Sequence, residues 1–330
     1  FKTVSYFIFS KIHGEIKETI STNDDERIEV KIVNIDNNLK YKFFKISDGR
    51  LYTDRIHDIA VLIDNKVIDE PSLQQRYYPN SHVMFNSTIR NNIVFSKGTP
   101  RKLKNLNGLT LSLLTGGGAN SNYWHWLFDV LPRIGLFNKA SNIKEIDFFL
   151  IPDDIKKFQN ETLNALNISE SKRLTSKKFR HIKAKKLIVT DHPVVISGDA
   201  TKDIMNMPAW ISKWLKESFI KNNKTNNKNN FKNIYIDRSE TNKNHQIQRV
   251  IENENEIKNL LIEKGFTSIK LHETNFSDQV QLFNNADCIV GLHGGGFANL
   301  AFCKPGTKVV ELKSLNAGAP IENLANKNNL

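Results

Sequence analysis

The chain has 330 residues, of which 39% are hydrophobic and 25% charged, and a formal net charge of +12. This length exceeds one ordinary core and predicts two domains, while the composition is that of a globular protein without an apolar run that could span a bilayer. The lysines are scattered and do not form a stripe with aromatic residues, so we expect no nucleic-acid partner. Attraction to an anionic membrane surface or an anionic sugar stays open.

The N-terminal stretch FKTVSYFIFSKIHGE has apolar residues interrupted by Lys11 and His13, and it lacks the pattern of a signal peptide. The chain does not begin with Met, so we expect its natural N-terminus to be missing. The two cysteines, Cys288 and Cys303, form neither a disulfide framework nor a metal site. Their apolar surroundings predict inert thiols in a reducing cytoplasm.

The first half of the chain predicts a β-rich segment followed by alternating strands and helices. Residues 1 to about 100 mix short alternating segments with turns, and 59–69 reads as two strands joined at Asp64-Asn65. Further on, segment 109–118 is expected to be a strand that runs into a glycine turn, and strands are expected at 147–152 and 185–190. Helices are expected at 122–133, 153–166 and 208–220, the last with Pro208 in its first turn. This alternation predicts a parallel sheet.

A second alternating unit follows the wholly polar segment KNNKTNNKNN (221–230), which we interpret as a linker. The expected strands are 233–238, 268–273, 288–293 and 307–313. The expected helices are 252–265 ending at Gly265, 277–286 N-capped by Ser277, and a short one in 294–303. The predicted domains are therefore 1–220 and 231–330, with substrate in the cleft between them at the carboxyl ends of the strands.

The segment VGLHGGGFANLAFC (290–303) carries the strongest ligand-binding signal. Its glycines let backbone amides approach a ligand, and a helix N-terminus favours an anion such as a diphosphate. His293 ends the strand and Asn299 lies in the helix; a tight turn without a ligand is the alternative. Neither a dinucleotide fingerprint nor a P-loop matches this spacing. Arg238 and Arg249 could pair with phosphate oxygens, with a surface salt bridge as the alternative for Arg249.

No metal site is predicted. The three carboxylates of ENENE (252–256) stand two residues apart, so they diverge on a helix, and acids in a first helical turn stabilise the helix dipole anyway. A D-x-D motif is absent from the sequence.

The segment NYWHWLFDVLPR (122–133) predicts a helix with one polar stripe. Asn122, His125, Asp129 and Arg133 follow helical spacing, and Pro132 is expected to end or kink the helix before Arg133. A histidine suits proton transfer near neutral pH, and a carboxylate one turn later would orient it. The alternative is a His–Asp pair that only satisfies itself in the core.

Three segments resemble motifs of the family 61 glycosyltransferases, in the same order over roughly residues 105–315. NYWHWLFDVLPR resembles the N-[YF]-x-H-W-x-x-[DE]-x-L-P-[RK] signature, and RVIENENEI resembles R-x-[IV]-x-N-E-x-E-[IL]. The segment 277–312 resembles the element built around G-x-H-G-[AG]-G-[LF]-x-N and P-G-x-x-V-[VI]-E. Gly295 stands where alanine is commoner. The family usually continues through another strand and helix, so the resemblance implies a C-terminal truncation at Leu330.

The resemblance implies an α/β GT-B fold, with two Rossmann-like domains facing each other across a cleft, and inversion at the anomeric carbon. It implies a hexosyl- or pentosyltransferase without a metal or other cofactor, which takes a nucleotide-sugar donor and a saccharide or lipid-linked saccharide acceptor. Bacterial relatives are similar to capsule and surface polysaccharide enzymes. The lack of a signal anchor in this sequence favours a cytoplasmic enzyme. Peripheral association with the inner face of the membrane stays open. A sugar-nucleotide epimerase and a non-catalytic polysaccharide-binding protein remain alternatives.

The expected site residues fall into three groups. His125 is the expected base, oriented by Asp129. Substrate contacts are expected from Asn122, Trp126, Gly117 and Gly118. Donor contacts are expected from Arg238, Arg249, His293, Gly294, Gly295, Gly296 and Asn299, and from Glu311 as a ligand of a ribose hydroxyl or as a structural carboxylate.

Overall fold

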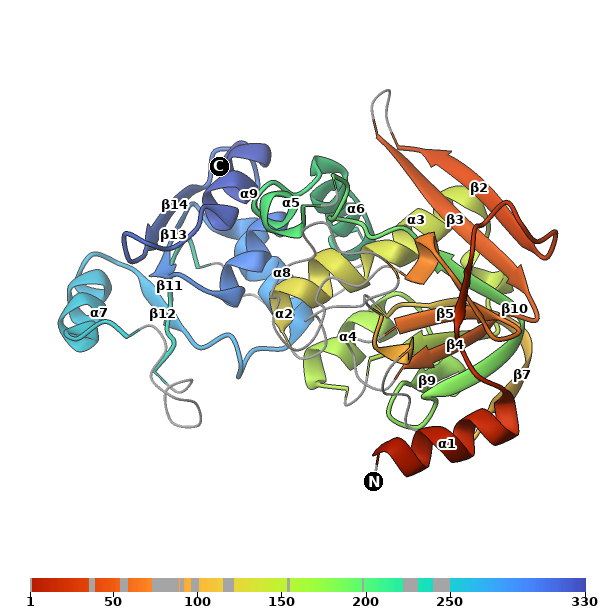
Figure 1. Ribbon diagram of the computed structural model, residues 1–330. Helices are drawn as coiled ribbons and strands as arrows, with labels where there is room; N and C mark the ends of the chain where they lie inside the picture. The colour runs from red at the N-terminus through yellow and green to blue at the C-terminus, as the bar shows by residue number, and fades with distance from the viewer. Residues whose placement is uncertain are drawn as a thin grey trace. The chain divides into compact units, whose positions relative to one another are not determined.

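The computed structural model of the chain divides into two compact units (Figure 1). It describes residues 2–35, 39–53, 59–72, 89, 92–95, 101–114, 122–152, 155–197, 199–221, 231–239 and 250–330. Unit 1 comprises residues 1–156 and 168–203, and unit 2 comprises 157–167 and 204–330. Most of the predicted linker, 222–230, lies outside the described residues.

The division between the units differs from the predicted border at residue 220. Helix α6 (Ala209–Phe219) belongs to unit 2 because the aromatic end of this amphipathic helix packs there. The ring centroid of Phe219 lies 4.9 Å from that of Phe276 and 6.3 Å from that of Phe302. Helix α4 (Lys157–Ala165) also belongs to unit 2, and helix α5 (Ala200–Met205) spans the division.

The described strands of unit 1 form one mixed sheet. Its main path runs β1-β6-β5-β4-β10-β7-β8-β9, and β3 joins β2 to β10. The strands are β1 (Glu18–Ile20), β2 (Ile28–Asn34), β3 (Lys40–Ser47), β4 (Arg50–Thr53), β5 (Ile59–Ile63), β6 (Lys66–Ile68), β7 (Lys104–Ser112), β8 (Phe148–Ile151), β9 (Arg173–Thr175) and β10 (His181–Thr190).

Strands β7 to β10 pair in parallel, as the alternation of strands and helices predicted. The predicted hairpin is confirmed as β5 and β6, and Asp64 adopts a φ of 51° in its turn. Strands β3 and β4, from the first 70 residues, pair with β10 in antiparallel orientation. They thereby extend the sheet beyond its parallel strands. One sheet face carries Leu51, Val61 and Ile63 in a large core, while Tyr52 and Leu62 alternate to the opposite face.

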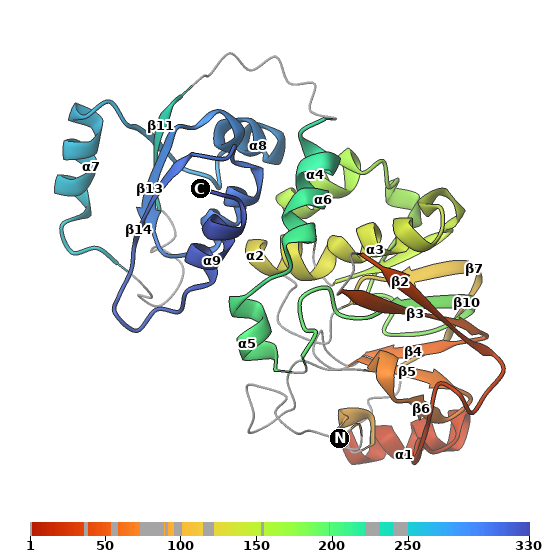
Figure 2. The ribbon, with the colours of Figure 1, turned by 90° about the horizontal axis from the view of Figure 1, so that it is seen from above.

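Helix α1 (Lys2–His13) packs on this second face of the sheet (Figure 2). The sequence pattern predicted only short alternating segments here. Apolar residues occur on both sides of the helix, so the sequence lacks the single apolar stripe by which a surface helix is recognised. The other described helical elements of unit 1 are η1 (Glu70–Ser72), η3 (Ile93–Phe95), α2 (Tyr123–His125), the π-helix η4 (Trp126–Val130), α3 (Pro132–Ala140), η5 (Ile143–Glu145) and η6 (Glu170–Lys172).

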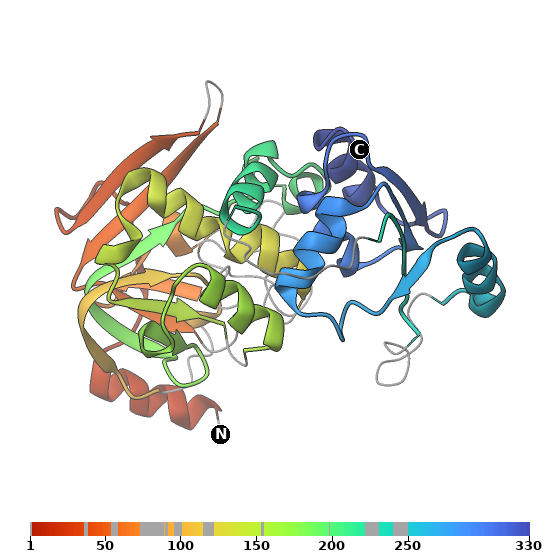
Figure 3. The ribbon, with the colours of Figure 1, turned by 180° about the vertical axis from the view of Figure 1, so that it is seen from behind.

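The described strands of unit 2 form a four-stranded, wholly parallel sheet in the order β12-β11-β13-β14. The strands are β11 (Asn233–Ile236), β12 (Thr267–Ile269), β13 (Cys288–Leu292) and β14 (Lys308–Leu312). Helix α7 (Glu254–Glu263) lies on one face of the sheet. The elements α8 (Phe276–Asn285), η8 (Gly295–Phe302) and α9 (Pro320–Lys327) lie on the other face (Figure 3).

Three details of unit 2 correct the expectations. The strand expected at 268–273 covers only 267–269, because the chain then turns. Helix α8 is capped by Asn275 and not by Ser277, since the Asn275 Oδ1 atom accepts a hydrogen bond from the Asp278 N–H at 2.8 Å. The short helix after the glycines is a 3-10 helix. The helix α7 stops before Gly265, as predicted, and this residue has a φ of +83° that suits glycine.

Candidate active site

The strand order of unit 2 creates a switch point between β11 and β13. From β11 the chain moves outward to β12 on one side, and it then returns to place β13 and β14 on the other side. In open parallel sheets a ligand binds in the crevice outside the carboxyl ends of the two strands at which the order reverses. These ends lead into Asp237-Arg238 and into His293-Gly294.

Arg238 and the glycine turn are packed together at this switch point. The Arg238 Nη1 atom donates a hydrogen bond to the His293 carbonyl oxygen at 2.6 Å. A Cβ atom at Gly294 would lie 2.5 Å from Nη1, and one at Gly296 would lie 2.8 Å from the Leu271 Cδ1 atom. The predicted Arg238 and glycine cluster are thus brought together, because only glycine at 294 lets the guanidinium lie against the backbone. Gly295 begins η8 directly after this contact.

His293 contacts the carboxylate of Glu311 on the neighbouring strand β14. Its Nδ1 atom is hydrogen-bonded to the Glu311 Oε1 atom, and both side chains are largely buried. A carboxylate accepts, so Nδ1 carries the proton and Nε2 is the ring atom left to face a ligand. Lys313 places its Nζ atom 3.6 Å from the other Glu311 oxygen. In this arrangement Glu311 orients His293, while its expected contact with a ribose hydroxyl stays a prediction.

Asn299 supports the glycine turn from beneath. Its side chain is fully buried, and Nδ2 donates to the Gly296 carbonyl oxygen at 3.2 Å and to the Gln279 Oε1 atom at 2.9 Å. Gln279 in turn donates to the Leu271 and Thr274 carbonyl oxygens. Asn299 thus holds the glycine turn in place, and its expected contact with a donor stays a prediction.

Asp237 is a residue that the sequence analysis missed. It is buried, and its carboxylate accepts from Lys258 Nζ at 2.5 Å, Ser268 Oγ at 3.1 Å and the Ser239 N–H at 2.9 Å. Burial alone would raise the pKa of this carboxyl, but these hydrogen bonds outweigh it and hold the pKa well below its usual range. Asp237 thus ties the end of β11 to α7 and β12. Its position directly before Arg238 at a strand end was the available signal.

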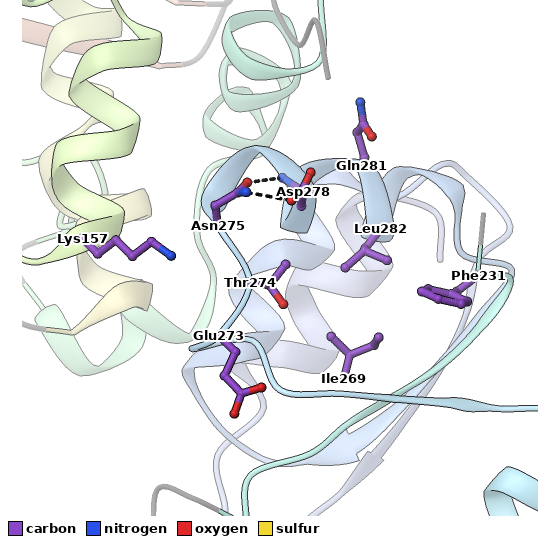
Figure 4. A pocket seen from close by; sticks show the side chains of 9 residues that line it. All are labelled: Lys157, Phe231, Ile269, Glu273, Thr274, Asn275, Asp278, Gln281 and Leu282. Atoms are coloured by element: carbon purple, nitrogen blue, oxygen red, sulfur yellow. Dashed lines mark hydrogen bonds between the residues drawn. The ribbon is translucent and has the colours of Figure 1, made fainter. Parts of the chain in front are cut away.

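A separate pocket of about 280 Å³ lies beside β12 and the start of α8 (Figure 4). Two of its lining side chains are Asn275, which caps α8, and Asp278, whose Oδ2 atom accepts a hydrogen bond from the Asn275 Nδ2 atom at 2.7 Å. Among the predicted site residues that the structure describes, none lines this pocket. The lining residues are Lys157, Phe231, Ile269, Glu273, Thr274, Asn275, Asp278, Gln281 and Leu282.

In unit 1, His125 and Asp129 form the predicted pair. The His125 Nδ1 atom lies 2.7 Å from the Asp129 Oδ2 atom, and the histidine side chain is 20% exposed while that of the aspartate is 3% exposed. The helix carrying them opens into a π-turn, in which the Leu131 N–H donates to the Trp126 carbonyl oxygen at 3.0 Å. Such turns are frequent at functional sites. The tautomer with a proton on Nδ1 leaves Nε2 able to accept a proton.

The helical segment changes before Arg133, where Pro132 was expected to end or kink it: η4 ends at Val130, and α3 begins at Pro132 after Leu131, which has right-handed helical dihedrals. Pro132 is the first residue of α3, a position at which its missing N–H costs little. Arg133 is buried, and it donates to the Asp129 carbonyl oxygen at 3.1 Å and to the Thr190 carbonyl oxygen at 3.1 Å. Burial lowers its pKa to about 10, so the guanidinium keeps its charge at neutral pH. The polar stripe therefore extends into the core.

His192, which the sequence analysis missed, follows β10 near this stripe. Its Nδ1 atom accepts from the Val194 and Val195 N–H groups at 3.1 and 3.0 Å, which places the ring proton on Nε2. Burial lowers its pKa to about 3. A cavity of about 30 Å³, the space of roughly one water, is lined by Arg133, Asp191 and His192 among others. Polar residues directly after the predicted strand 185–190 were the signal.

The remaining predicted substrate residues have different placements. Asn122 is exposed and N-caps α2, since its Oδ1 atom accepts from the Trp124 N–H at 2.9 Å. Trp126 is 1% exposed, so its ring offers no face to a substrate in this conformation. Gly117, Gly118 and Arg249 lie outside the described residues.

A family model described as Glycosyltransferase 61 matches residues 123–310, which is more than half of the chain. The chain belongs to this glycosyltransferase family. The match includes His125, Asp129, Arg238 and the glycine turn, and it ends one residue before Glu311. A comparison with curated proteins gave no match.

As a member of this family, the protein is a glycosyltransferase that acts on a donor and an acceptor substrate. Among the helices that the structure describes, none combines the length and the hydropathy that a membrane span requires.

Proposed function

We propose that this glycosyltransferase is an inverting, metal-independent enzyme that moves a hexose or pentose from a nucleotide-sugar donor to a saccharide or lipid-linked saccharide acceptor. The observation that carries the proposal is the switch point of unit 2, where Arg238 lies against the His293-Gly294 backbone. It combines a guanidinium, a glycine turn and a histidine at the place where parallel sheets bind nucleotides.

The donor diphosphate is the natural ligand for this group of side chains. As the bond from the anomeric carbon to the phosphate oxygen breaks, negative charge develops on the leaving diphosphate and must be stabilised. Arg238 supplies a fixed positive charge, the turn at Gly294 to Gly296 supplies backbone N–H groups, and His293 is oriented by Glu311. In the proposal these groups do the work that a metal ion does in other transferases.

The acceptor is activated by His125. Its Nε2 atom takes the proton of the acceptor hydroxyl while the acceptor oxygen bonds to the anomeric carbon and the diphosphate leaves from the opposite face. Asp129 accepts the hydrogen bond from Nδ1 and stabilises the imidazolium that forms. A single displacement of this kind inverts the anomeric configuration.

The proposal includes the GT-B arrangement, the cytoplasmic location and the role in bacterial surface polysaccharide synthesis that the family resemblance implies. The wholly parallel, doubly wound sheet of unit 2 supports a Rossmann-like donor domain. A crystal structure with a bound nucleotide would test the arrangement of the two units.

The decisive experiment is a calorimetric titration of the chain with nucleoside diphosphates, followed by product analysis with the matching sugar donor. We expect binding by the wild type in the presence of EDTA, loss of binding in Arg238→Ala, and a product of inverted anomeric configuration by NMR. Metal-dependent binding, or retention of configuration, would contradict the proposal. Conversion of the donor without any acceptor would indicate an epimerase instead.

A further inference from the structure

Helix α1 presents a continuous apolar stripe to solvent. Val4, Phe7, Ile8 and Ile12 are 63%, 61%, 47% and 68% exposed. Together with the exposed Lys11 they stand at positions i, i+3, i+4, i+7 and i+8 of the helix, an arc of about 140°. Single exposed apolar residues are common, but four large ones on one helical face mark an interaction surface.

The opposite side of α1 is held by the core of unit 1. Phe9 is buried, with its ring centroid 5.9 Å from that of Tyr52 and 5.6 Å from that of His181. Ser5 is also buried. Figures 1 and 3 show α1 at the border of unit 1, with the strands on one side of it. The apolar stripe is therefore turned outward by the packing of the other face.

The charges around the stripe have one net sign. Helix α1 contains no acidic residue, and the Lys11 Nζ atom lies 5.5 Å from the centroid of the Phe7 ring. The two acids that follow the helix are each paired with a lysine, Glu15 with Lys17 and Glu18 with Lys66. The whole chain carries a net charge of +12. A partner that fits this face should therefore have an anionic surface with an apolar layer beneath it.

An anionic lipid bilayer has this chemistry. Helices that lie in the membrane interface bury an apolar face at the acyl boundary, while lysines extend their charged ends to the phosphates. We propose that α1 docks on an anionic bilayer through a docking stripe made of Val4, Phe7, Ile8, Lys11 and Ile12. This inference does not depend on the proposed transfer reaction.

The test is co-sedimentation of the full chain with vesicles. We expect binding to phosphatidylcholine vesicles that contain about 30% phosphatidylglycerol, and weaker binding to phosphatidylcholine alone or at high salt. The double variant Phe7→Ser/Ile12→Ser should lower the partition coefficient roughly tenfold or more, since two apolar side chains no longer insert. Lys11→Gln should weaken binding to the anionic vesicles only.

The matched control removes two exposed apolar side chains elsewhere. Ile32 and Leu260 are 56% and 53% exposed, and Ile32→Ser/Leu260→Ser should bind vesicles like the wild type. Circular dichroism and melting temperature verify that both double variants are folded. The proposal is overturned if the wild type does not sediment with anionic vesicles, or if the two double variants bind equally. A molar mass that falls from dimer to monomer in Phe7→Ser/Ile12→Ser would assign the stripe to a second copy instead.

Discussion

At the scale of single residues, the proposed chemistry depends on side chains that are fixed by a second polar group. His125 is held by Asp129, His293 by Glu311, and Arg238 by the carbonyl oxygen of His293. Each of these hydrogen bonds fixes the direction of a group before a ligand arrives, which reduces the ordering cost of the reaction.

The first prediction concerns the His125–Asp129 pair. Asp129→Asn preserves the shape of the side chain but removes the charge that stabilises the imidazolium, so we expect kcat to fall by about 10²- to 10⁴-fold. Nucleotide binding, measured by calorimetry, should stay near the wild-type value. Asp287→Asn at an exposed site of unit 2 is the control and should be as active as the wild type. A fully active Asp129→Asn enzyme would remove Asp129 from the mechanism.

The second prediction concerns the close approach at Gly294. In Gly294→Ala the new methyl group would meet the Arg238 Nη1 atom at 2.5 Å and push the guanidinium away. We expect nucleoside diphosphate affinity to fall by roughly tenfold or more, because a charge-assisted contact is displaced. Gly295→Ala is the matched control, since the resemblance places alanine at this position in relatives. Equal affinities for the two variants would show that the packing at Gly294 does not matter.

At the scale of secondary-structure elements, the position of helix α8 matters for the glycine turn of the candidate site, and the N-terminal cap fixes where this helix begins. The sequence pattern placed the N-cap of α8 at Ser277, but Asn275 has the extended backbone and the side-chain bond to the Asp278 N–H. The cap lies two residues earlier because Phe276 is buried and already forms part of the helix. Helix α8 also carries Gln279, through which Asn299 and the glycine turn are anchored.

The third prediction follows from this cap. Asn275→Ala leaves the Asp278 N–H without its side-chain partner, so we expect unit 2 to lose about 1 kcal/mol of stability. Ser277→Ala, at the position that the sequence pattern favoured, should cost clearly less. Urea denaturation followed by circular dichroism compares the two variants. A greater loss in Ser277→Ala would restore the original assignment of the cap.

At the scale of the whole molecule, His181 and His192 are buried in the described part of unit 1, and burial favours their neutral form. Burial lowers the pKa of His181 to about 3, assisted by the positive charge of Arg50, which donates to its Nε2 atom. His192 has a pKa of about 3 for the same primary reason. In the unfolded chain both take up a proton near the ordinary histidine pKa of about 6.5. Protonation therefore favours the unfolded state.

The fourth prediction is that unit 1 becomes less stable in mild acid. Its stability is complete above about pH 6.5 and decreases as the pH falls from there toward 3, because the unfolded chain binds more protons. At pH 5 each histidine should cost on the order of 2 kcal/mol. Urea titrations at pH 7 and pH 5 measure the effect. A midpoint of the unit 1 transition that does not move would show that the two histidines are not held neutral.

The sequence by itself determined the family, the α/β class and most of the elements. Periodic apolar patterns, the polar pair in NYWHWLFDVLPR and the glycine turn are local features, and local features are present in the order of residues. The pairing of His125 with Asp129 was predictable for this reason, since residues four apart on a helix are neighbours.

Only the tertiary structure decided how distant residues share one environment. The antiparallel strands of the first 70 residues join the parallel strands in one sheet, and helix α6 packs with unit 2 instead of ending unit 1. Asp237 lies 21 residues before Lys258, yet their side chains meet at 2.5 Å. The burial of Asn299, which makes it a support of the glycine turn, likewise depends on α8. Such contacts arise when separate elements pack around a common core, and no local pattern specifies which elements will meet.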